Sequence, residues 1–364
     1  ETIDKTYDEI APAPRNALAM ITREPLGVIG AVVPWNYPMM ITSWKLGPAL
    51  AMGNTIVVKP AENSSLSALK MAELAIAAGL PAGVFNVVPG LGAEAGQALA
   101  RHMDVAKIAF TGSGPTGRKM MQYAAESNMK QVSLELGGKS PQVVLNDCTD
   151  LEAAASTIAW AIYYNAGQTC NAGSRIIVEK GVKEELFAHL HKFLESFVVG
   201  NQFDPTTQMA GLVSELQRDR VNAYLDLIGQ DGEKLVFGGE KTTGKDLLIK
   251  PTLIDNVKPG SRLAQEEIFG PVLVAIDAKD EAEALQLANG TEYGLAASVW
   301  TSNVARAHKF ARKLRAGTVW VNTFDMLDVI TPFGGFGASG NGRDKSLHAL
   351  DAYSALKTTW VDLN

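Results

Sequence analysis

Cys170 is the residue of this sequence best suited to covalent chemistry. It lies in the run Gly167-Gln-Thr-Cys170-Asn-Ala-Gly173, after a helical stretch rich in aromatic residues. The small flanking residues would let a substrate approach closely and let a backbone N–H point at a developing oxyanion. A thiol is a strong nucleophile only as the thiolate, so this cysteine would need a positive field or a nearby base. Taken alone, a single cysteine after a helix is more often a buried structural residue.

Asn36, Lys59 and Glu62 follow the ends of two predicted strands. Open α/β sheets bind their ligands at the carboxyl ends of strands. Asn36, in the run Pro34-Trp-Asn-Tyr-Pro38, offers an amide donor there, while Lys59 and Glu62 offer groups that could bind a phosphate or ribose hydroxyls. Each segment taken alone is more often an ordinary polar turn.

A glycine-rich turn suggests a nucleotide cofactor. The run Gly112-Ser-Gly114-Pro-Thr-Gly117 follows a predicted strand, precedes a predicted helix and matches the pattern G-x-G-x-x-G. In dinucleotide-binding folds such glycines hold a pyrophosphate at a helix N-terminus, and an acid further along the chain binds a ribose. Glu135 stands near the position of that acid, so on this interpretation it would be a ribose ligand. A second role for Glu135 stays open.

The sequence around these segments alternates short β-rich runs with helical stretches. This alternation is typical of βαβ units, and hence of a parallel sheet covered on both faces. It begins near Glu24 and restarts after Gly137-Gly138, which predicts two doubly wound α/β domains, with residues 229–262 as surface loops or an edge hairpin. We expect strands at 27–33, 55–59, 84–88, 107–111, 142–145 and 175–179, and helices at 44–52, 65–78, 93–101, 150–164, 183–198, 282–289 and 305–316.

Composition and charge argue against several classes of protein. The chain has 364 residues, a formal net charge of −6 and no apolar stretch of the roughly 20 residues that cross a bilayer, so we expect no membrane contact. Nucleic-acid binding is not expected either, because it concentrates basic charge on one face. Two cysteines form no disulfide framework, and without a signal sequence they favour a cytoplasmic location. The five histidines offer no pair on one helix face, so we expect no metal site.

Seven segments, taken together and in this order, resemble the aldehyde dehydrogenase superfamily. The resemblance covers essentially the whole chain, and seven segments in the family's order and spacing are far more specific than any one of them. The segments are Pro34-Trp-Asn36, Lys59-Pro-Ala-Glu62, Phe110-Thr-Gly-Ser113, Leu134-Glu-Leu-Gly-Gly-Lys-Ser-Pro141, Gly167-Gln-Thr-Cys170, Glu266-Glu-Ile-Phe-Gly-Pro271 and Pro332-Phe-Gly-Gly335.

The resemblance implies NAD(P)-dependent oxidation of an aldehyde to a carboxylate. It implies an aldehyde dehydrogenase-like α/β fold, with two doubly wound parallel-sheet domains and a small β oligomerisation element. Cys170 would attack the aldehyde carbon, and the Asn36 amide and the Cys170 backbone N–H would bind the oxyanion. Glu135 would be the general base that activates water for hydrolysis of the thioester. The family thus favours this role for Glu135 over the ribose role.

The same resemblance implies a cofactor site. An acid at Glu62 would repel a 2′-phosphate, so NAD is the expected cofactor; NADP stays possible because Lys59 could offset the repulsion. The residues expected in this site are Trp35 along the cleft, Lys59 and Glu62 at the adenosine ribose, Gly112 and Ser113 at the pyrophosphate, and Glu267 and Phe269 at the nicotinamide ribose.

A finer resemblance concerns the substrate. The run Ser339-Gly-Asn-Gly-Arg-Asp-Lys-Ser-Leu-His-Ala-Leu350 resembles the branch that oxidises γ-glutamyl-γ-aminobutyraldehyde, guanidinobutyraldehyde and related polyamine-derived aldehydes. The carboxylates of Asp325 and Asp328 could attract an amino or guanidino tail, although they fit two solvated loop acids equally well. The residues expected in the substrate tunnel are Tyr37, Trp44, Tyr164, Asp325, Asp328 and Phe333.

The resemblance also divides the chain into segments. Residues 1–25 would hold oligomerisation strands and a linker, 26–137 the NAD-binding domain, 138–338 the catalytic domain, and 339–364 a return segment and a C-terminal oligomerisation strand. Members of the family begin well before the position that matches Glu1, so we expect the N-terminal part of the cofactor domain to be missing. A homo-oligomer, either a dimer or a tetramer, is expected by analogy. Gln131, Gly337 and Ala355 stand where many relatives have charged residues, which bears on the stability of that oligomer.

Two other functions stay open beside the aminoaldehyde dehydrogenase. One keeps the reaction but makes the substrate a betaine-type or general aldehyde. The other is a truncated, non-catalytic relative that acts as a structural or binding subunit. The presence of Cys170, Glu135 and Asn36 argues against this last reading, and the expected lack of N-terminal elements argues for it.

Overall fold

The structure is a computed structural model that describes residues 3–364. It forms two compact units, and each is described by itself. Unit 1 contains the described chain up to Leu136 together with Asp328–Gly334 and Gly340–Asn364. Unit 2 contains Gly137–Leu327 and Gly335–Ser339.

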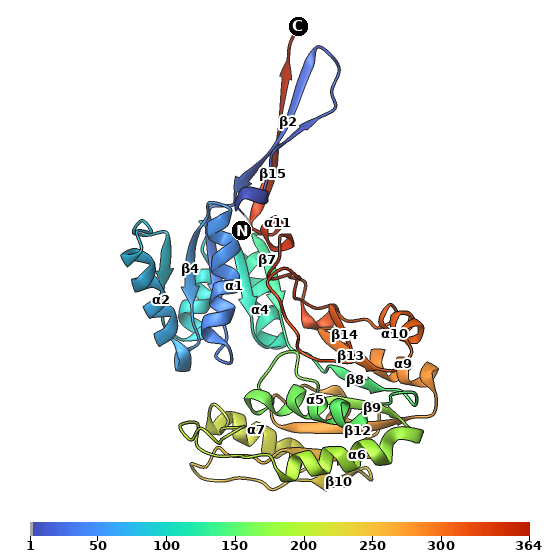
Figure 1. Cartoon of the computed structure of the whole chain (residues 1–364). Coiled ribbons are helices and arrows are strands. Elements are labelled where there is room, and N and C mark those ends of the chain that lie inside the picture. Colours follow the sequence, from blue (N-terminus) through green and yellow to red (C-terminus); the bar gives the residue numbers. More distant parts are fainter. Residues whose placement is uncertain (1–2) are drawn as a thin grey trace. The chain divides into compact units, whose positions relative to one another are not determined.

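Unit 1 is built on a five-stranded parallel sheet (Figure 1). Its strands lie in the order β5-β4-β3-β6-β7, which is the 3-2-1-4-5 arrangement of doubly wound dinucleotide-binding sheets. The strands are β3 (Val28–Val32), β4 (Thr55–Lys59), β5 (Phe85–Val87), β6 (Val105–Thr111) and β7 (Gln131–Glu135).

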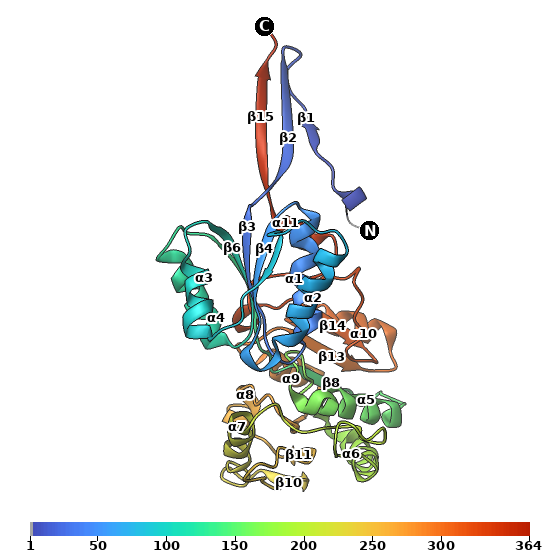
Figure 2. The same cartoon turned by 90° about the vertical axis from the view of Figure 1, so that its left-hand side faces the viewer.

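Helices cover both faces of this sheet (Figure 2). Alternate strand residues point to opposite faces, so that Ile29 and Ala109 pack under one pair of helices, whereas Ile108 and Phe110 pack under the other. The helical segments are η1 (Ile3–Lys5), α1 (Pro38–Ala51), η2 (Glu62–Ser64), α2 (Leu66–Ala77), η3 (Gly92–Gly96), α3 (Gln97–Arg101), α4 (Gly114–Ala125) and α11 (His348–Asp351). Helix α1 begins earlier than the predicted start at residue 44, because Pro38 fits the first turn, where its missing N–H has no partner to lose.

A separate antiparallel sheet in unit 1 joins the two ends of the described chain. It has the order β1-β2-β15, with β1 (Glu9–Ala11), β2 (Ala17–Pro25) and β15 (Ser354–Asp362). Strands β2 and β15 pair along their whole length, from Ala17 with Asp362 to Pro25 with Ser354. The small β element expected from the sequence is therefore present.

Unit 2 has a seven-stranded sheet in the order β10-β11-β12-β9-β8-β13-β14. All its neighbouring pairs are parallel except β10 with β11, which form the edge hairpin predicted for residues 229–262. The sheet is thus mixed rather than wholly parallel. The strands are β8 (Pro141–Val144), β9 (Arg175–Glu179), β10 (Lys234–Phe237), β11 (Thr252–Asp255), β12 (Val272–Ala278), β13 (Ala296–Trp300) and β14 (Thr318–Val321).

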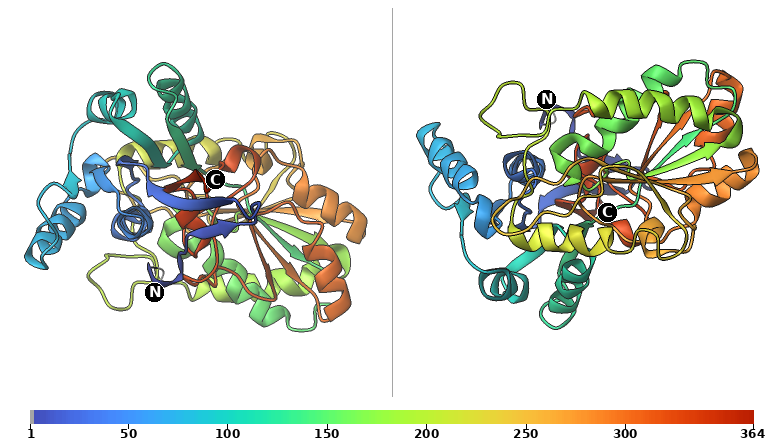
Figure 3. Two further views of the ribbon diagram at one scale, coloured as in Figure 1. Left: turned by 90° about the horizontal axis from the view of Figure 1, so that it is seen from above. Right: turned by 90° about the horizontal axis from the view of Figure 1, so that it is seen from below.

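Helices lie on both faces of the unit 2 sheet (Figure 3), and a hydrophobic core on each face holds them against it. Ile176 and Val178 of β9 pack toward α5, α6 and α7, whereas Ile177 between them packs toward α9 and α10. The helical segments are α5 (Leu151–Tyr163), η4 (Tyr164–Gly167), α6 (Lys180–Glu195), α7 (Glu215–Leu225), α8 (Arg262–Gln265), α9 (Glu281–Asn289), α10 (Val304–Ala311) and η5 (Gly337–Ser339). Across the described residues, no helix has the length and apolar character needed to cross a bilayer.

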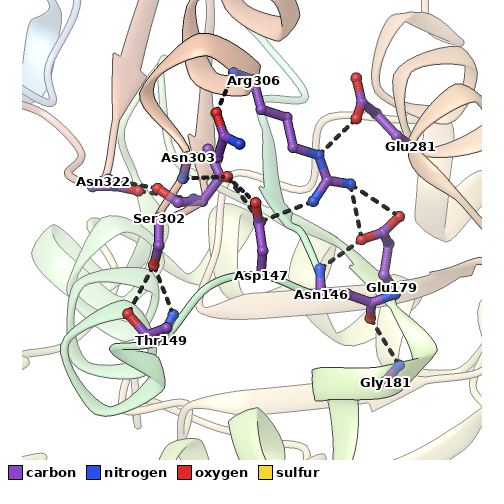
Figure 4. A network of polar contacts seen from close by, with 11 residues as sticks. Asn146, Asp147, Thr149, Glu179, Gly181, Glu281, Ser302, Asn303, Arg306 and Asn322 are labelled. Atoms are coloured by element: carbon purple, nitrogen blue, oxygen red, sulfur yellow. Dashed lines mark hydrogen bonds and ion pairs between the residues drawn. The ribbon is translucent and has the colours of Figure 1, made fainter.

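A charge network centred on Arg306 joins the carboxyl ends of three strands of unit 2 (Figure 4). The guanidinium of Arg306, on α10, contacts Asp147 at 2.9 Å, Glu179 at 3.3 Å and Glu281 at 2.6 Å. Asp147 also accepts a hydrogen bond from the hydroxyl of Thr301. The Glu179 side chain is only 3% exposed and also accepts a hydrogen bond from the Asn146 N–H, so loss of the arginine would leave a buried carboxylate without its cation.

We expect Arg306→Met to lower the free energy of unfolding by about 2–4 kcal/mol, because it leaves Glu179 buried without its cation. Thermal unfolding followed by circular dichroism would measure this. Arg312→Met, at the exposed end of the same helix, is the matched control and should change stability by no more than about 0.5 kcal/mol. Equal losses in the two variants would show that the network contributes nothing specific.

Candidate active site

The strand order of unit 1 gathers most of its predicted site residues at one edge of the sheet. In a doubly wound sheet, ligands bind outside the carboxyl ends of the strands where the strand order reverses, here between β3 and β6. Trp35 and Asn36, both half-buried, follow β3, and Glu135 is the last residue of β7. The remaining residues at this edge are Lys59 and Glu62 at the end of β4, and Gly112 and Ser113 after β6.

Lys59 and Glu62 form an ion pair of 2.7 Å between Nζ and Oε1. The lysine is buried, and the carboxylate is 46% exposed on its side-chain surface. Partial burial raises the pKa of Glu62, but hydrogen bonds from Lys59 and from the backbone outweigh it and hold the pKa below its usual value. The carboxylate is therefore ionised at neutral pH and can accept hydrogen bonds from ribose hydroxyls.

The N-terminus of α4 fits the pyrophosphate of a dinucleotide. Within the described chain, its first turn contains no acidic residue, and Ser113 at the N-cap makes no side-chain bond to the helix backbone. The Ser113 hydroxyl pairs instead with the hydroxyl of Thr116 at 3.1 Å. The first backbone N–H groups of the helix are thus not capped, which is the arrangement that binds phosphate groups.

Glu135 ends β7 as a buried carboxylate with a perturbed pKa. The side chain is 4% exposed, and neither oxygen has a hydrogen-bond partner among the described residues. Burial raises the pKa of Glu135 well above its usual range, and the negative charge of Asp344 adds to this rise, while Lys45 and Arg343 oppose it. A carboxylate with a raised pKa is a stronger base, so the group is suited to taking a proton from water.

Lys45 and Asp344 form a buried ion pair next to Glu135 that the sequence analysis missed. Their charged atoms are 2.5 Å apart, and their side chains are 1% and 5% exposed. The position of Lys45 in the sequence does indicate a buried charge. It shares a buried helix face with Ile41 and Ala49, four residues before and after it, where an apolar residue is expected.

The predicted tunnel residues of unit 1 lie at the N-cap of α1 and within it, and on the segment that begins at Asp328. The rings of Trp44 and Phe333 are 5.4 Å apart, and the Lys345 ammonium lies over both, at 5.2 and 5.6 Å. Lys345 also donates to the backbone carbonyl of Asp328, whose carboxylate accepts from a backbone N–H within its own loop. Tyr37 is half-buried against the core under α1.

In unit 2 the backbone before Cys170 adopts an unusual, strained conformation. Asn165, Ala166 and Gly167 all have positive φ angles, of 51°, 53° and 71°, which is a costly conformation for the first two. Gln168 then ties the turn to neighbouring chain by donating to the Asn165 carbonyl and accepting from the Val213 N–H. Cys170 follows as a half-buried residue whose thiol is not in a disulfide with any described residue.

The paired glycines Gly137 and Gly138 let two other segments approach the backbone. A Cβ on Gly138 would lie 2.8 Å from the Cys170 carbonyl oxygen, and one on Gly137 would overlap the Glu267 carboxylate. The Gly138 N–H donates to Glu267 at 3.1 Å. The structure therefore brings Cys170 and Glu267 to the same glycine pair of unit 2.

Glu267 and Lys139 have pKa values shifted toward each other. Burial raises the pKa of Glu267 to about 7, against the opposing effects of the Gly138 hydrogen bond, Arg220 and Lys139. Burial likewise lowers the pKa of Lys139 to about 7, helped by Arg175 and opposed by Glu267 and Glu266. Lys139 was not predicted, although it follows directly after the glycine pair.

Three further predicted residues belong to unit 2. Asp325 accepts a hydrogen bond of 2.7 Å from Asn171, which directly follows Cys170, so this acid lies near the cysteine loop. Phe269 has a positive φ of 60°, and its carbonyl accepts a hydrogen bond from Gln217. Tyr164 is exposed.

Comparison with known proteins identifies the family. The aldehyde dehydrogenase family model matches residues 1–359. Two curated relatives align over 363 residues, which is the whole chain and 73% of each relative. They are the NADP/NAD-dependent aldehyde dehydrogenase PuuC of Escherichia coli (strain K12), 49% identical, and the aminoacetaldehyde dehydrogenase of Pseudomonas aeruginosa, 50% identical.

Two solved structures also match the whole chain, over 74% of their own length. An indole-3-acetaldehyde dehydrogenase complexed with NAD+ has a TM-score of 0.96, and a γ-glutamyl-γ-aminobutyraldehyde dehydrogenase from Burkholderia cenocepacia J2315 has a TM-score of 0.95; both are 51% identical. The chain therefore belongs to the aldehyde dehydrogenase family, and the expected aldehyde dehydrogenase-like α/β fold is confirmed. It is an NAD(P)-dependent oxidoreductase that acts on an aldehyde, which decides against the non-catalytic alternative.

We expect Gly167→Ala to destabilise the protein by roughly 2–4 kcal/mol, because the new Cβ would overlap the Gly270 carbonyl and the φ of 71° is unfavourable for alanine. Gly229→Ala is the matched control, since Gly229 has a φ of 87° with open space around its Cα. It should cost only about 1 kcal/mol. Thermal unfolding of the two variants would separate the clash from the φ penalty, and equal losses would rule the clash out.

Proposed function

We propose that Cys170 is the nucleophile of this aldehyde dehydrogenase, that Glu135 is its general base and that Asn36 binds the oxyanion. The observation that carries these roles is the Glu135 carboxylate, which is buried, has no hydrogen-bond partner among the described residues and has a raised pKa. A carboxylate that served only as a ribose ligand would be expected to resemble Glu62, which is half-exposed with a lowered pKa. This contrast favours the base role over the ribose role suggested by the glycine pattern.

The proposed reaction proceeds in two stages. The Cys170 thiolate attacks the aldehyde carbon, a C–S bond forms, and the carbonyl π electrons move to oxygen, which receives hydrogen bonds from the Asn36 amide and the Cys170 N–H. Bound NAD(P) would supply the hydride acceptor at this point. As the hydride leaves the carbon, the C=O bond re-forms and Cys170 is left holding a thioester. Water then attacks the thioester while Glu135 takes its proton, the C–S bond breaks, and the carboxylic acid and the thiolate are released.

The cofactor site that we propose uses Lys59 and Glu62 for the adenosine ribose, and Gly112 and Ser113 at the N-terminus of α4 for the pyrophosphate. The ionised Glu62 and the uncapped helix support this assignment. Trp35 would line the cleft, and Glu267 with Phe269 would bind the nicotinamide ribose.

We further propose that the substrate is a polyamine-derived aminoaldehyde, such as γ-glutamyl-γ-aminobutyraldehyde. Two proteins about 50% identical to this chain carry the names aminoacetaldehyde dehydrogenase and γ-glutamyl-γ-aminobutyraldehyde dehydrogenase. Asp325 and Asp328 would attract the amino group. The rival is an uncharged aromatic or aliphatic aldehyde, because another relative of equal identity is an indole-3-acetaldehyde dehydrogenase.

A homo-oligomer remains part of this proposal. Strand β15 lies at one edge of its sheet and carries the exposed side chains Leu356 and Trp360. An exposed edge strand with apolar side chains is suited to pairing with a second copy.

We expect Cys170→Ala to abolish NADH formation from any aldehyde. Glu135→Gln should still release one equivalent of NADH in a rapid burst, because acylation needs no water, and should then hydrolyse the thioester at least about a hundredfold more slowly. Stopped-flow absorbance measures both phases. If Glu135→Gln instead formed NADH at the wild-type steady-state rate but bound NAD more weakly, the result would indicate that Glu135 binds the ribose.

Replacing Asp325 and Asp328 together by Asn should raise the KM for 4-aminobutyraldehyde and its γ-glutamyl derivative by roughly tenfold, because two attractive charges are lost. The KM for hexanal is the control and should stay within about twofold. A proportional rise for hexanal would contradict the charge argument while leaving the mechanism intact.

A further inference from the structure

A groove of about 470 Å³ opens on the surface of unit 1. Its wall is mostly apolar, and Pro48, Ile330 and Leu350 are among the residues that line it. Lys5 and Lys345 also line it, whereas no acidic side chain does so among the described residues. Small-molecule sites have volumes of roughly 300–1,000 Å³, so the groove has the size of such a site. Because the charge of its lining is positive, it favours an organic ligand that carries a negative charge.

Lys345 is the cation of this groove that the fold holds in place. Its side chain is mostly buried, and its ammonium donates to the Asp328 carbonyl at 3.0 Å. The ammonium also lies over the rings of Trp44 and Phe333, at 5.2 and 5.6 Å from their centres. Phe333 exchanges two backbone hydrogen bonds with Asp344, the residue before Lys345. Since Trp44 lines the groove as well, the ammonium lies where the groove meets two of the residues proposed for the substrate tunnel.

The backbone that carries Lys345 is strained. Lys345 and Ser346 both have positive φ angles, of 62° and 55°, which are unfavourable for residues other than glycine. The Ser346 N–H donates to the carbonyl of Val329, another residue of the groove wall, at 2.8 Å. Such strain persists only where the surrounding contacts hold it, so these contacts fix the backbone from which the lysine side chain extends.

We propose that Lys345 is a specificity-determining residue that binds the carboxylate at the far end of a γ-glutamylated aldehyde. The γ-glutamyl tail carries an α-carboxylate and an α-ammonium, whereas a simple aminoaldehyde carries an ammonium alone. The Lys345 ammonium attracts the carboxylate and repels a bare ammonium. The groove thereby selects the γ-glutamyl derivative among the aminoaldehydes. The inference rests on the aminoaldehyde substrate that is proposed above.

The partner of the α-ammonium in this proposal is Asp328, which lies beside the groove rather than in its wall. Lys345 contacts the backbone carbonyl of Asp328, and the exposed Asp328 carboxylate accepts a hydrogen bond from the Ile330 N–H at 3.0 Å. A cation and an anion held on adjoining backbone match the two charges of an α-amino acid head group, which neither charge does alone. The apolar wall of the groove then contacts the methylene groups of the tail.

Three aldehydes of the same chain length separate these two charges. They are γ-glutamyl-γ-aminobutyraldehyde, its N-glutaryl analogue, which lacks the α-amino group, and its N-pentanoyl analogue, which lacks both charged groups. Steady-state NADH formation gives the KM and kcat for each aldehyde. We expect the wild-type KM for the N-glutaryl substrate to be about tenfold below that for the N-pentanoyl substrate, and Lys345→Met to reduce this preference to within about twofold.

Two further readouts separate binding of the tail from a structural role of Lys345. The ratio of the kcat values for the two analogues should not change in Lys345→Met, because the lysine contacts the tail and not the reacting carbon. The KM for 4-aminobutyraldehyde should not rise, because this variant removes a cation that repels its ammonium. A general loss of structure would instead raise the KM for all these aldehydes.

Lys345→Arg keeps the charge and should keep most of the preference for the N-glutaryl substrate. Lys70→Met is the matched control, since Lys70 lies on α2 of the same unit, has a 59% exposed side chain and does not line the groove. It should keep the wild-type preference. Lys345→Gln serves if Lys345→Met does not fold, because the amide can still donate to the Asp328 carbonyl.

Equal KM values for the N-glutaryl and N-pentanoyl substrates in the wild-type enzyme would overturn the inference. So would a preference that persists in Lys345→Met, or in Lys345→Gln if it replaces that variant, and so would an equal loss of preference in Lys70→Met. Failure of the proposed function gives different results. NADH formation would then persist in Cys170→Ala, or the wild-type enzyme would oxidise 4-aminobutyraldehyde and its γ-glutamyl derivative no more efficiently than hexanal.

Discussion

The buried ion pair between Lys45 and Asp344 is the interaction on which the rest of unit 1 depends. It joins the first helix of the sheet to a segment that returns from far along the chain, and it holds that segment against β7. The segment in turn seals Glu135 from solvent, since Asn341 and Gly342 both bond to the backbone of Leu134. Two charges at 1% and 5% exposure are stable only as partners, so loss of either would leave an uncompensated charge beside Glu135.

In unit 2 the corresponding constraint is steric. Gly138 lies against the Cys170 carbonyl, Gly137 against Glu267, and Gly167 against Gly270, so three segments meet where no side chain intervenes. The cysteine loop also contains Asn165 and Ala166 in left-handed conformations, which the surrounding contacts must stabilise. Close backbone packing therefore fixes the position of Cys170 within its unit, whereas in unit 1 an ion pair between Lys45 and Asp344 holds the segment that covers Glu135.

Much of this architecture could be predicted from local pattern. The alternation of strands and helices from Glu24 to Glu179 predicted most elements of that stretch, because doubly wound sheets repeat one short unit. The buried strands β12 and β13 were not predicted, because a short, continuously apolar run has no hydrophobic periodicity that distinguishes a strand from a helix. Lys45 on an apolar helix face indicated a buried charge that needs a partner. That partner lies 299 residues away, and no local pattern encodes such a pairing.

The return of the chain to unit 1 has a consequence for the order of folding. Sheet β1-β2-β15 pairs residues near 20 with residues near 360, and the environment of Glu135 is completed only by residues 340–344. During synthesis, the strands of the five-stranded sheet emerge long before these partners. Until Asp344 has been translated, Lys45 stays solvated and without its ion-pair partner. Contacts of such long sequence separation are slow to form, so the surroundings of Glu135 are completed late, only after residues 340–344 have been translated.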